Sequence, residues 1–424
     1  MTRTGTPLTA SGLTASEAPG LVASGSDTGG RVVALDALRG IAVAGIALMN
    51  VYIYALPPAA YFNPVAAGNE SVPDWLVWGL SFVLVEDKFR SLFAMLFGAG
   101  VAILIERAQG AGEGHPVRDH IARMLVLFAI GAAHAILLAN NDVLRLYAMA
   151  GLFLPLFLWL SARDLLLAGA VLMVLHVLGG TLMAFLWLTA DPGTPSAVLP
   201  AQAFGSDPVA LDYAQVMGTE DFGERMARRL SGFFAALGTQ VPGIPSTLGT
   251  MLIGAGLWRN GLLQGRWDRG RSFALAARLA SIALPVLCML MMLDAWADFA
   301  GAMVGPVSLF WSLPFDLMLA VAYAATVIAV FSGRESALRT RLAAAGRLSL
   351  TNYLLTSLVF ALIFYSWGIG LYGSLSRSAA FALAFVPIAL MMLWSPLWLA
   401  RFRQGPFEWL WRGIARGRFG PILR

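Results

Sequence analysis

A histidine and an aspartate in an otherwise apolar stretch are the residues best suited to chemistry. His134 lies about one helical turn inside the end of an apolar block, and Asp142 lies in the short polar connection that follows. A carboxylate that hydrogen-bonds one imidazole nitrogen fixes the tautomer and leaves the other nitrogen as a general base toward a hydroxyl. The alternative is structural: His134 would bond a carbonyl group or a neighbouring helix while Asp142 pairs with Arg145. The spacing is compatible with both.

A cluster of ionisable residues, 86–90, begins the second apolar block. Ionisable groups within a bilayer are costly and need a partner, a watery cavity or a task. Lys88 and Arg90 are therefore candidates for contact with a substrate, and Tyr147 joins them from the connection that contains Asp142. An interfacial knot of salt bridges is the alternative.

A second polar cluster is expected at the opposite face. Asp36 and Arg39 stand at i, i+3 and can pair on one helix face, while Arg347, Asn352 and Tyr353 begin a later apolar block. Arginine suits the phosphates of a nucleotide because its guanidinium group binds them in a bidentate manner. The cluster predicts either such an anion site or a structural network of salt bridges.

Three other polar residues in or near apolar blocks carry weaker predictions. His176 lies in the middle of a block beside two glycines, which favours a hydrogen bond between helices. Asp316 is a lone carboxylate in an apolar block and must find a donor or a proton. His120 is expected in a solvated loop.

The composition shows which elements must position these residues. Of the 424 residues, 58% are hydrophobic and 12% are charged, against about 25% charged in a soluble domain. Blocks of roughly twenty apolar residues recur, the length that a helix needs to cross about 30 Å of hydrocarbon. The sequence predicts an all-α polytopic membrane bundle of about ten transmembrane helices. The expected spans are 33–56, 89–105, 121–139, 144–160, 165–190, 233–257, 273–296, 307–331, 348–367 and 379–400.

The charges between these blocks predict an orientation. Arginines cluster after every second span, whereas the connections 61–74 and 191–224 have no basic residue. By the positive-inside rule both chain termini are cytoplasmic. The net charge of +5 therefore reflects orientation, and no nucleic-acid partner is expected. The exceptions are Arg225, Arg228, Arg229 and Arg377. The short apolar segment 75–85 is expected as an outer interfacial helix.

The chain divides into three expected parts. Residues 1–30 are rich in small polar residues and predict a disordered tail. Residues 31–404 form the membrane-embedded bundle, and residues 405–424 form a cytoplasmic amphipathic tail. The single cysteine, Cys288, gives no disulfide framework and no cysteine metal site, and we expect no metal cofactor. No P-loop, dinucleotide-binding glycine motif, nucleophile elbow or zinc-protease motif is present in the sequence.

Several segments resemble the YeiB family of bacterial membrane proteins, and the resemblance covers nearly everything after residue 30. The stretch from His134 to Tyr147 has a similar His, Asp and Tyr pattern. The other segments are 34–50 (ALDALRGIAVAGIALMN), 88–100 (KFRSLFAMLFGAG), 346–353 (GRLSLTNY), 363–373 (IFYSWGIGLYG) and 405–412 (GPFEWLWR).

This family is in turn similar to transmembrane acyltransferases of the heparan glucosaminide N-acetyltransferase type. Their first core helix has a similar Asp-x-x-Arg-Gly start and a functional asparagine near its far end, which Asn50 matches. The resemblance implies that an acyl group passes from cytoplasmic acyl-CoA, as co-substrate, to an acceptor on the other side. The catalytic histidine of those enzymes has no counterpart in the connection 61–74, so His134 is expected to replace it.

The leading expectation is therefore an acyltransferase with catalytic Asn50, His134 and Asp142. Arg39 and Arg347 would engage the CoA phosphates, and the acceptor would be a hydroxyl or amine of a glycan or lipid-linked molecule. The expected location is the bacterial cytoplasmic membrane, with the lipid bilayer as a partner and a second copy of the chain as a candidate partner. The alternatives are a transporter or flippase that uses Asp316 and His134 as a proton relay, and a non-catalytic membrane scaffold.

Overall fold

The computed structural model describes residues 1–2, 25–68, 71–111, 115–139, 142–331 and 335–424. Within these residues the protein is helical, and its extended pairing is limited to one isolated bridge between Phe402 and Leu423. The helices are α1 (Gly25–Ala55), η1 (Pro58–Tyr61), η2 (Pro64–Ala67), α2 (Val72–Leu84), α3 (Lys88–Ala111), α4 (Pro116–Leu137), α5 (Val143–Phe153), η3 (Leu154–Leu156), α6 (Ala162–Leu188), α7 (Pro195–Phe204), α8 (Pro208–Thr219), α9 (Phe222–Ser231), α10 (Phe233–Gly238), η4 (Val241–Gly243), α11 (Ile244–Arg259), α12 (Arg269–Trp296), α13 (Gly301–Pro306), η5 (Val307–Trp311), α14 (Leu313–Phe331), α15 (Ala337–Arg347), α16 (Ser349–Phe364), α17 (Arg377–Leu383), α18 (Phe385–Arg401) and α19 (Pro406–Arg416).

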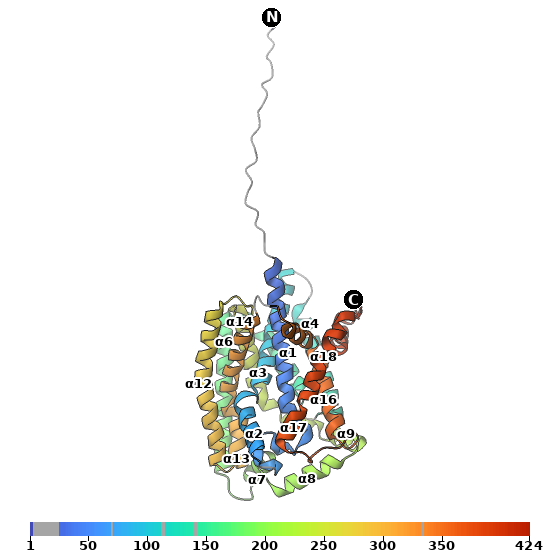
Figure 1. Ribbon diagram of the computed structural model, residues 1–424. Helices are drawn as coiled ribbons and strands as arrows, with labels where there is room; N and C mark the ends of the chain where they lie inside the picture. Colours follow the sequence, from blue (N-terminus) through green and yellow to red (C-terminus); the bar gives the residue numbers. More distant parts are fainter. Residues whose placement is uncertain (3–24, 69–70, 112–114, 140–141, 332–334) are drawn as a thin grey trace.

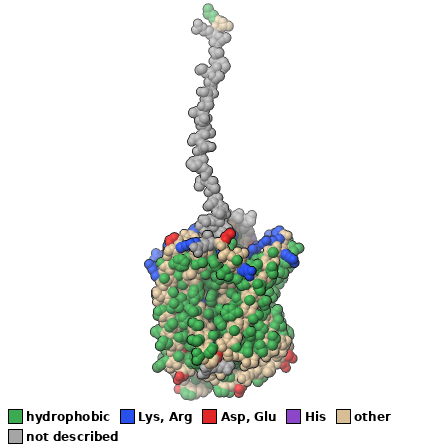
Figure 2. Space-filling model, in the orientation of Figure 1, with side chains coloured by type: hydrophobic (Ala, Val, Ile, Leu, Met, Phe, Trp, Pro, Cys, Tyr) green, Lys and Arg blue, Asp and Glu red, His purple; other side chains and the backbone are tan. Residues whose placement is uncertain are grey.

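The helices form a bundle with the surface of a membrane protein. Hydrophobic side chains cover the middle of the visible face, while Lys and Arg gather at one end and Asp and Glu at the other (Figure 2). The first turns of α1 and the C-terminal end of the chain lie at the arginine-rich end (Figure 1). The start of α1 and the C-terminal end are thus on one side of the bundle, and the positive-inside rule predicts that this side is cytoplasmic.

Seven helical segments of the described chain are long and apolar enough to cross a bilayer, and an eighth crossing results if α15 and α16, which meet at 85°, count as one. Two other expected spans, 144–160 and 233–257, contain the shorter helices α5 and α11, of 11 and 16 residues. The all-α multi-pass bundle is confirmed, while ten crossings stay a prediction. The seven segments are Val33–Ala55, Val72–Gly110, Pro116–Leu137, Ala162–Leu188, Arg269–Trp296, Leu313–Phe331 and Arg377–Arg401.

The prediction of a separate interfacial helix at 75–85 is wrong. α2 continues into α3, and together they make one apolar segment of 39 residues, Val72–Gly110. α2 packs against α12 and α17 rather than lying across the end of the bundle. Hydropathy missed this arrangement because Glu86, Asp87 and Lys88 interrupt the apolar run at the junction.

α1 lies at the centre of the bundle and packs against α3, α15 and α16. The crossing with α15 is close enough for the two backbones to touch. A Cβ atom on Gly40 would lie 2.1 Å from the carbonyl oxygen of Leu342, and one on Gly346 would lie 1.8 Å from that of Asp36. Only glycine fits at such a contact. The crossing brings the polar start of α1 next to Arg347 at the end of α15.

Candidate functional site

A cavity of about 280 Å³ lies in the half of the bundle nearer the acidic end. It is bounded by the last turns of α1, the junction of α2 and α3, the first turns of α5 and α11, and η5. We call it the outer cavity. Its polar lining residues are Asn50, Tyr61, Asp87, Arg90, Asp142, His176, Thr239, Gln240, Ser246 and Tyr353.

Asn50 contributes an amide to the outer cavity. Its side chain is half-buried and forms no hydrogen bond with another residue of the described chain. A primary amide carries two N–H donors and one acceptor oxygen. Asn50 can therefore donate to an oxygen of a bound molecule without giving up an existing contact.

His134 and Asp142 form the pair that the sequence predicts. Nδ1 of His134 lies 2.7 Å from Oδ1 of Asp142, and both side chains are buried. Asp142 is the N-cap of α5, where its Oδ2 accepts the backbone N–H of Arg145 at 2.9 Å, as aspartate commonly does. The alternative ion pair between Asp142 and the Arg145 guanidinium is longer, at 3.8 Å. The hydroxyl of Tyr353 lies 3.4 Å from Oδ1 of Asp142.

Gly131 makes this pair sterically possible. A Cβ atom at Gly131, one turn before His134 on α4, would lie 2.6 Å from Oδ2 of Asp142 and 2.8 Å from the backbone nitrogen of Arg145. Such contacts are too short for any real Cβ atom. The glycine therefore lets the first turn of α5 approach α4 closely enough for Asp142 to reach His134.

The two members of the pair differ in their position relative to the outer cavity. Asp142 lines the cavity, whereas His134 is not among the described residues that do so. The imidazole packs against the ring of Tyr353, with 5.1 Å between the ring centroids. Its Nε2 is buried and forms no hydrogen bond within the described chain. Asp142, rather than His134, is thus the member of the pair that lines the cavity.

Arg90 and Asp87 supply a second polar group in the outer cavity. Nε of Arg90 lies 2.6 Å from Oδ1 of Asp87, as a pair at i, i+3 at the start of α3. Asp87 has a φ of 54°, in the left-handed region that aspartate enters more readily than most residues. This turn ends α2, starts α3, and positions the ion pair on the cavity wall.

His176 also lines the outer cavity. Its Nε2 lies 3.1 Å from the carbonyl oxygen of Leu309, so the hydrogen bond between helices that the sequence favours is present. Leu309 belongs to η5, a π-helical turn, and such turns are frequent at functional sites.

A second cavity, of about 410 Å³, lies nearer the arginine-rich end. We call it the inner cavity. Arg39 pairs with Asp36 at 2.8 Å, and Arg347 donates to the carbonyl oxygen of Arg403 at 3.1 Å. The excess of guanidinium groups suits a ligand with several negative charges. The ionisable lining residues, apart from tyrosine, are Asp36, Arg39, His120, Arg123, Arg347, Arg403, Glu408 and Arg412.

The C-terminal helix α19 forms one wall of the inner cavity. The Glu408 carboxylate accepts the backbone N–H groups of Leu350 and Thr351 at 2.8 and 3.1 Å, and the Thr351 hydroxyl at 2.5 Å. Glu408 therefore caps the first turn of α16 from another helix, and burial raises the pKa of its carboxyl group. Trp411 donates to the carbonyl oxygen of Arg123 at 2.7 Å. The predicted amphipathic tail is thus packed into the bundle.

The two cavities meet at a thin partition. Ile46, Val143 and Tyr353 line both of them. Tyr353 is buried, and its hydroxyl is within 3.5 Å of the backbone nitrogen of Val143. We call these three residues the partition. The inner and outer cavities are therefore neighbours that share these three residues as a common wall.

Lys88 and Asn352 are candidate site residues that are absent from the lining of both cavities. Nζ of Lys88 lies 2.6 Å from Oδ1 of Asp316, and both side chains are 1% exposed. This ion pair supplies the donor that Asp316 requires. The amide of Asn352 donates to the carbonyl oxygen of Ala345 and to the Ser395 hydroxyl. Their contacts tie helices together.

Two other candidate residues are placed differently from what their sequence neighbours suggest. Tyr147 lines the inner cavity, and its hydroxyl donates to the carbonyl oxygen of Arg90 at 2.6 Å. His120, expected in a solvated loop, is instead buried on α4 with Nε2 2.8 Å from the carbonyl oxygen of Gly151. The prediction for His120 is wrong because α4 begins at Pro116 and takes His120 into the bundle.

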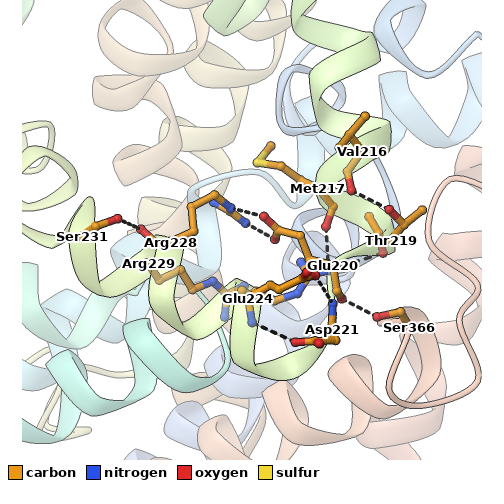
Figure 3. Close-up of polar contacts among 12 residues, drawn as sticks. Val216, Met217, Thr219, Glu220, Asp221, Glu224, Arg228, Arg229, Ser231 and Ser366 are labelled. Carbon is orange, nitrogen blue, oxygen red and sulfur yellow. Dashed lines mark hydrogen bonds and ion pairs between the residues drawn. The ribbon is translucent and has the colours of Figure 1, made fainter.

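The arginines that break the charge rule fasten helices to one another. Arg228 forms two hydrogen bonds with Glu220, of 2.6 and 2.7 Å (Figure 3), and these hydrogen bonds lower the pKa of the Glu220 carboxyl group. Arg229 donates to the Tyr365 hydroxyl at 2.9 Å. That hydroxyl in turn donates to the carbonyl oxygen of Leu138, at the end of α4, at 3.0 Å.

Arg377, the fourth exception, has a similar structural role. Its guanidinium group donates to the carbonyl oxygens of Ala60 and Asn63 and lies over the ring of Tyr52. These contacts hold the connection after α1 against α17. The remaining exception, Arg225, donates to the carbonyl oxygens of Met217 and Gly218 at 2.8 and 3.4 Å. All four exceptions thus have structural contacts, and none of them argues against the predicted orientation.

Sequence reasoning missed several residues of the two cavities, among them Arg123, Arg403, Arg412 and Gln240. Arg123, Arg403 and Arg412 were interpreted only as orientation signals, because the sequence does not indicate that their segments converge. Gln240 lines the outer cavity and donates to the backbone carbonyl of Asp142 at 2.8 Å. No motif surrounds it, so no sequence signal points to it.

Comparison with known proteins agrees with these observations. Residues 257–418 match the family described as "Protein of unknown function (DUF418)". The Escherichia coli (strain K12) protein "Uncharacterized protein YeiB" is 32% identical over 406 residues, which are 93% of this chain and 98% of that protein. The Bacillus subtilis (strain 168) protein "Uncharacterized protein YxaH" is 28% identical over 421 residues, or 94% and 97% of the two chains. Because the similarity extends over nearly the whole of both chains, the protein belongs to the YeiB family.

Proposed function

We propose that this protein is a transmembrane acyltransferase, which moves an acyl group from cytoplasmic acyl-CoA to a hydroxyl or amine acceptor on the other side of the membrane. The observation that carries the proposal is the pair of cavities separated only by the partition of Ile46, Val143 and Tyr353. A donor held on one side and an acceptor held on the other need such an arrangement. The proposed location is the cytoplasmic membrane of a bacterium.

The inner cavity suits the nucleotide part of the donor. Five arginines line it against two carboxylates, and arginine binds phosphate oxygens in a bidentate manner. Arg39 and Arg347 are the groups proposed to engage the CoA phosphates, with Arg123, Arg403 and Arg412 around them. The thioester arm would then extend past the partition toward Asn50.

The outer cavity has the groups that acyl transfer requires. The free amide of Asn50 would donate to the thioester carbonyl oxygen as negative charge develops there, and one such donor is worth about 3 kcal/mol in a dry site. The pair of Asp142 and His134 lies at the wall of the same cavity. The mixture of amide, hydroxyl and charged side chains suits an acceptor with several hydroxyl groups, such as a glycan or the head of a lipid-linked molecule.

Binding of acyl-CoA to the purified protein tests the proposal. A ligand that binds only the folded state raises its melting temperature, so we expect acetyl-CoA to stabilise the wild-type protein. The double variant Arg39→Gln/Arg347→Gln should lose this shift. Asn50→Ala should keep it but release CoA about 10²–10³ times more slowly. The proposal fails if no CoA ester of a small panel stabilises the wild-type protein, or if Asn50→Ala turns over at the wild-type rate.

A transporter of a small amphiphilic solute is a second candidate, because two cavities on opposite sides of a thin partition also suit alternating access. The buried Lys88–Asp316 ion pair is the kind of group that transporters use for coupling. This candidate predicts uptake of a solute without release of free CoA from acyl-CoA. A thiol assay on proteoliposomes loaded with acetyl-CoA distinguishes the two.

A further inference from the structure

Two buried imidazoles lie near the outer cavity, but only one of them lines it. His176 is part of the cavity wall, whereas His134 is separated from the cavity by Asp142 and Tyr353. A general base must come within hydrogen-bonding distance of the proton that it accepts, directly or through one water. His176 meets this requirement without any movement of the partition.

The surroundings of His176 are built to hold its ring in one orientation. Nε2 is 3.1 Å from the carbonyl oxygen of Leu309, and the backbone of Pro242, which also lines the cavity, is a second and weaker hydrogen-bonding partner of the ring. The ring packs on Phe310 with 4.8 Å between centroids. Phe310 reaches this place because Gly180, one turn further along α6, has no side chain: a Cβ atom there would lie 2.0 Å from the Phe310 ring. A carbonyl acceptor at Nε2 fixes the proton on that nitrogen and stabilises the ring when it becomes cationic.

We propose that His176 is the residue that accepts the proton of the acceptor, and that His134 is a positioning residue that acts through Asp142. The inference rests on the proposed acyl transfer. The hydroxyl or amine of the acceptor attacks the thioester carbonyl carbon, a C–O or C–N bond forms, and the C–S bond breaks. The proton passes from the acceptor to His176 and then to the sulfur, so that CoA leaves as the thiol.

The charged groups that share the cavity with His176 are compatible with this role. Arg90 and Asp87 are paired with each other at 2.6 Å, so neither is a free base. Asp142 is engaged by His134 and by the backbone N–H of Arg145. Of the groups that line the described part of this cavity, His176 is the one whose ordinary pKa lies nearest neutrality.

Turnover of two glutamine variants tests the assignment, with acetyl-CoA as donor and ethanolamine as the probe acceptor. Glutamine at position 176 keeps an N–H donor for the carbonyl of Leu309 but cannot accept the proton. We expect His176→Gln to release CoA about 10²–10⁴ times more slowly, with an unchanged melting-temperature shift on acetyl-CoA binding. His134→Gln should slow the reaction less, because it disturbs only the position of Asp142. Wild-type turnover by His176→Gln would overturn the inference.

Chemical rescue separates a proton-transfer role from a structural one. In His176→Gly the space of the lost ring joins the outer cavity, so added imidazole should restore CoA release at least in part. In His134→Gly the same imidazole should have no effect because Asp142 and Tyr353 close the site. Rescue of His134→Gly but not of His176→Gly would reverse the two roles.

A labelling experiment keeps this inference distinct from the proposed function. Diethylpyrocarbonate, added to the ligand-free wild-type protein in detergent, should modify His176 and spare His134, as read by mass spectrometry of peptides. Modification of His134 with His176 spared would overturn the inference whatever the donor is. Failure of the wild-type protein to bind any CoA ester would instead refute the acyltransferase while the labelling pattern stands.

Discussion

Replacing Lys88 tests whether the ion pair in the middle of the bundle holds the fold together or takes part in function. Nζ of Lys88 lies 2.6 Å from Oδ1 of Asp316, and it also donates to the carbonyl oxygen of Phe82. Removing one member of a buried pair costs about 3–5 kcal/mol, because the other charge stays buried without a partner. Leaving a buried carbonyl without its donor adds about 1–3 kcal/mol. We expect Lys88→Met to lower the free energy of unfolding by the sum of these two costs.

The double variant Lys88→Met/Asp316→Leu isolates the ionic part of this cost. Removing both charges together is close to neutral when similar volumes fill the space, so the double variant should keep only the loss at the Phe82 carbonyl. Each single variant leaves one buried charge without its partner, at a cost of about 3–5 kcal/mol. The coupling free energy in the double-mutant cycle should therefore be about 6–10 kcal/mol in magnitude, the sum of these two ionic costs. Unfolding of the purified protein by SDS in mixed micelles measures all four proteins of the cycle.

Acetyl-CoA binding by the folded double variant completes this experiment. If the ion pair is structural, acetyl-CoA should raise the melting temperature of the double variant as much as that of the wild-type protein. A single variant as stable as the wild type would refute the stability argument. A double variant that folds but no longer binds acetyl-CoA would show that the pair serves donor binding rather than stability alone.

Two further predictions concern the contacts that shape the cavities. Gly131→Ala should destabilise the protein by about 1–3 kcal/mol through overpacking and slow CoA release, because its Cβ would lie 2.6 Å from Oδ2 of Asp142; the matched control Gly179→Ala, with open space at its Cβ, should be neutral or stabilising. Equal effects of the two alanines on unfolding and turnover would contradict the argument. Because burial raises the pKa of Glu408 above its ordinary value of 4.5, its contribution to stability is complete below pH 4.5 and is lost as the pH rises through the folded-state pKa. The free energy of unfolding should therefore fall with rising pH in the wild-type protein and not in Glu408→Gln. Identical pH dependences of the two proteins would refute this prediction.

The local chemistry of the site follows from sequence because its partners are close along the chain. His134 and Asp142 are eight residues apart, at the end of one helix and at the N-cap of the next, so a tight connection brings them together almost regardless of the rest of the fold. Asp36 and Arg39 pair on one helix face for the same reason. Local sequence also indicates a membrane protein and the difference in charge between the two ends of the bundle. Both inferences depend only on runs of apolar residues and on the charges that follow them.

The tertiary structure alone decided which of these groups share a cavity. The partner of Asp316 is Lys88, on a distant helix, and the arginines of the inner cavity come from α1, α4, α15, α19 and the connection after α18. Likewise only the packing of α6 against η5 places His176 on the outer cavity wall.

The physical reason is the medium in which the helices pack. Lipid tails are as apolar as leucine, so the hydropathy that marks each span carries no information about which spans become neighbours. That choice depends on close contacts such as the backbone crossing at Gly40 and Gly346, and on polar pairs between helices. The sequence thus determined the all-α bundle of apolar helices and predicts its orientation, and packing between helices determined the two cavities and the partition where they meet.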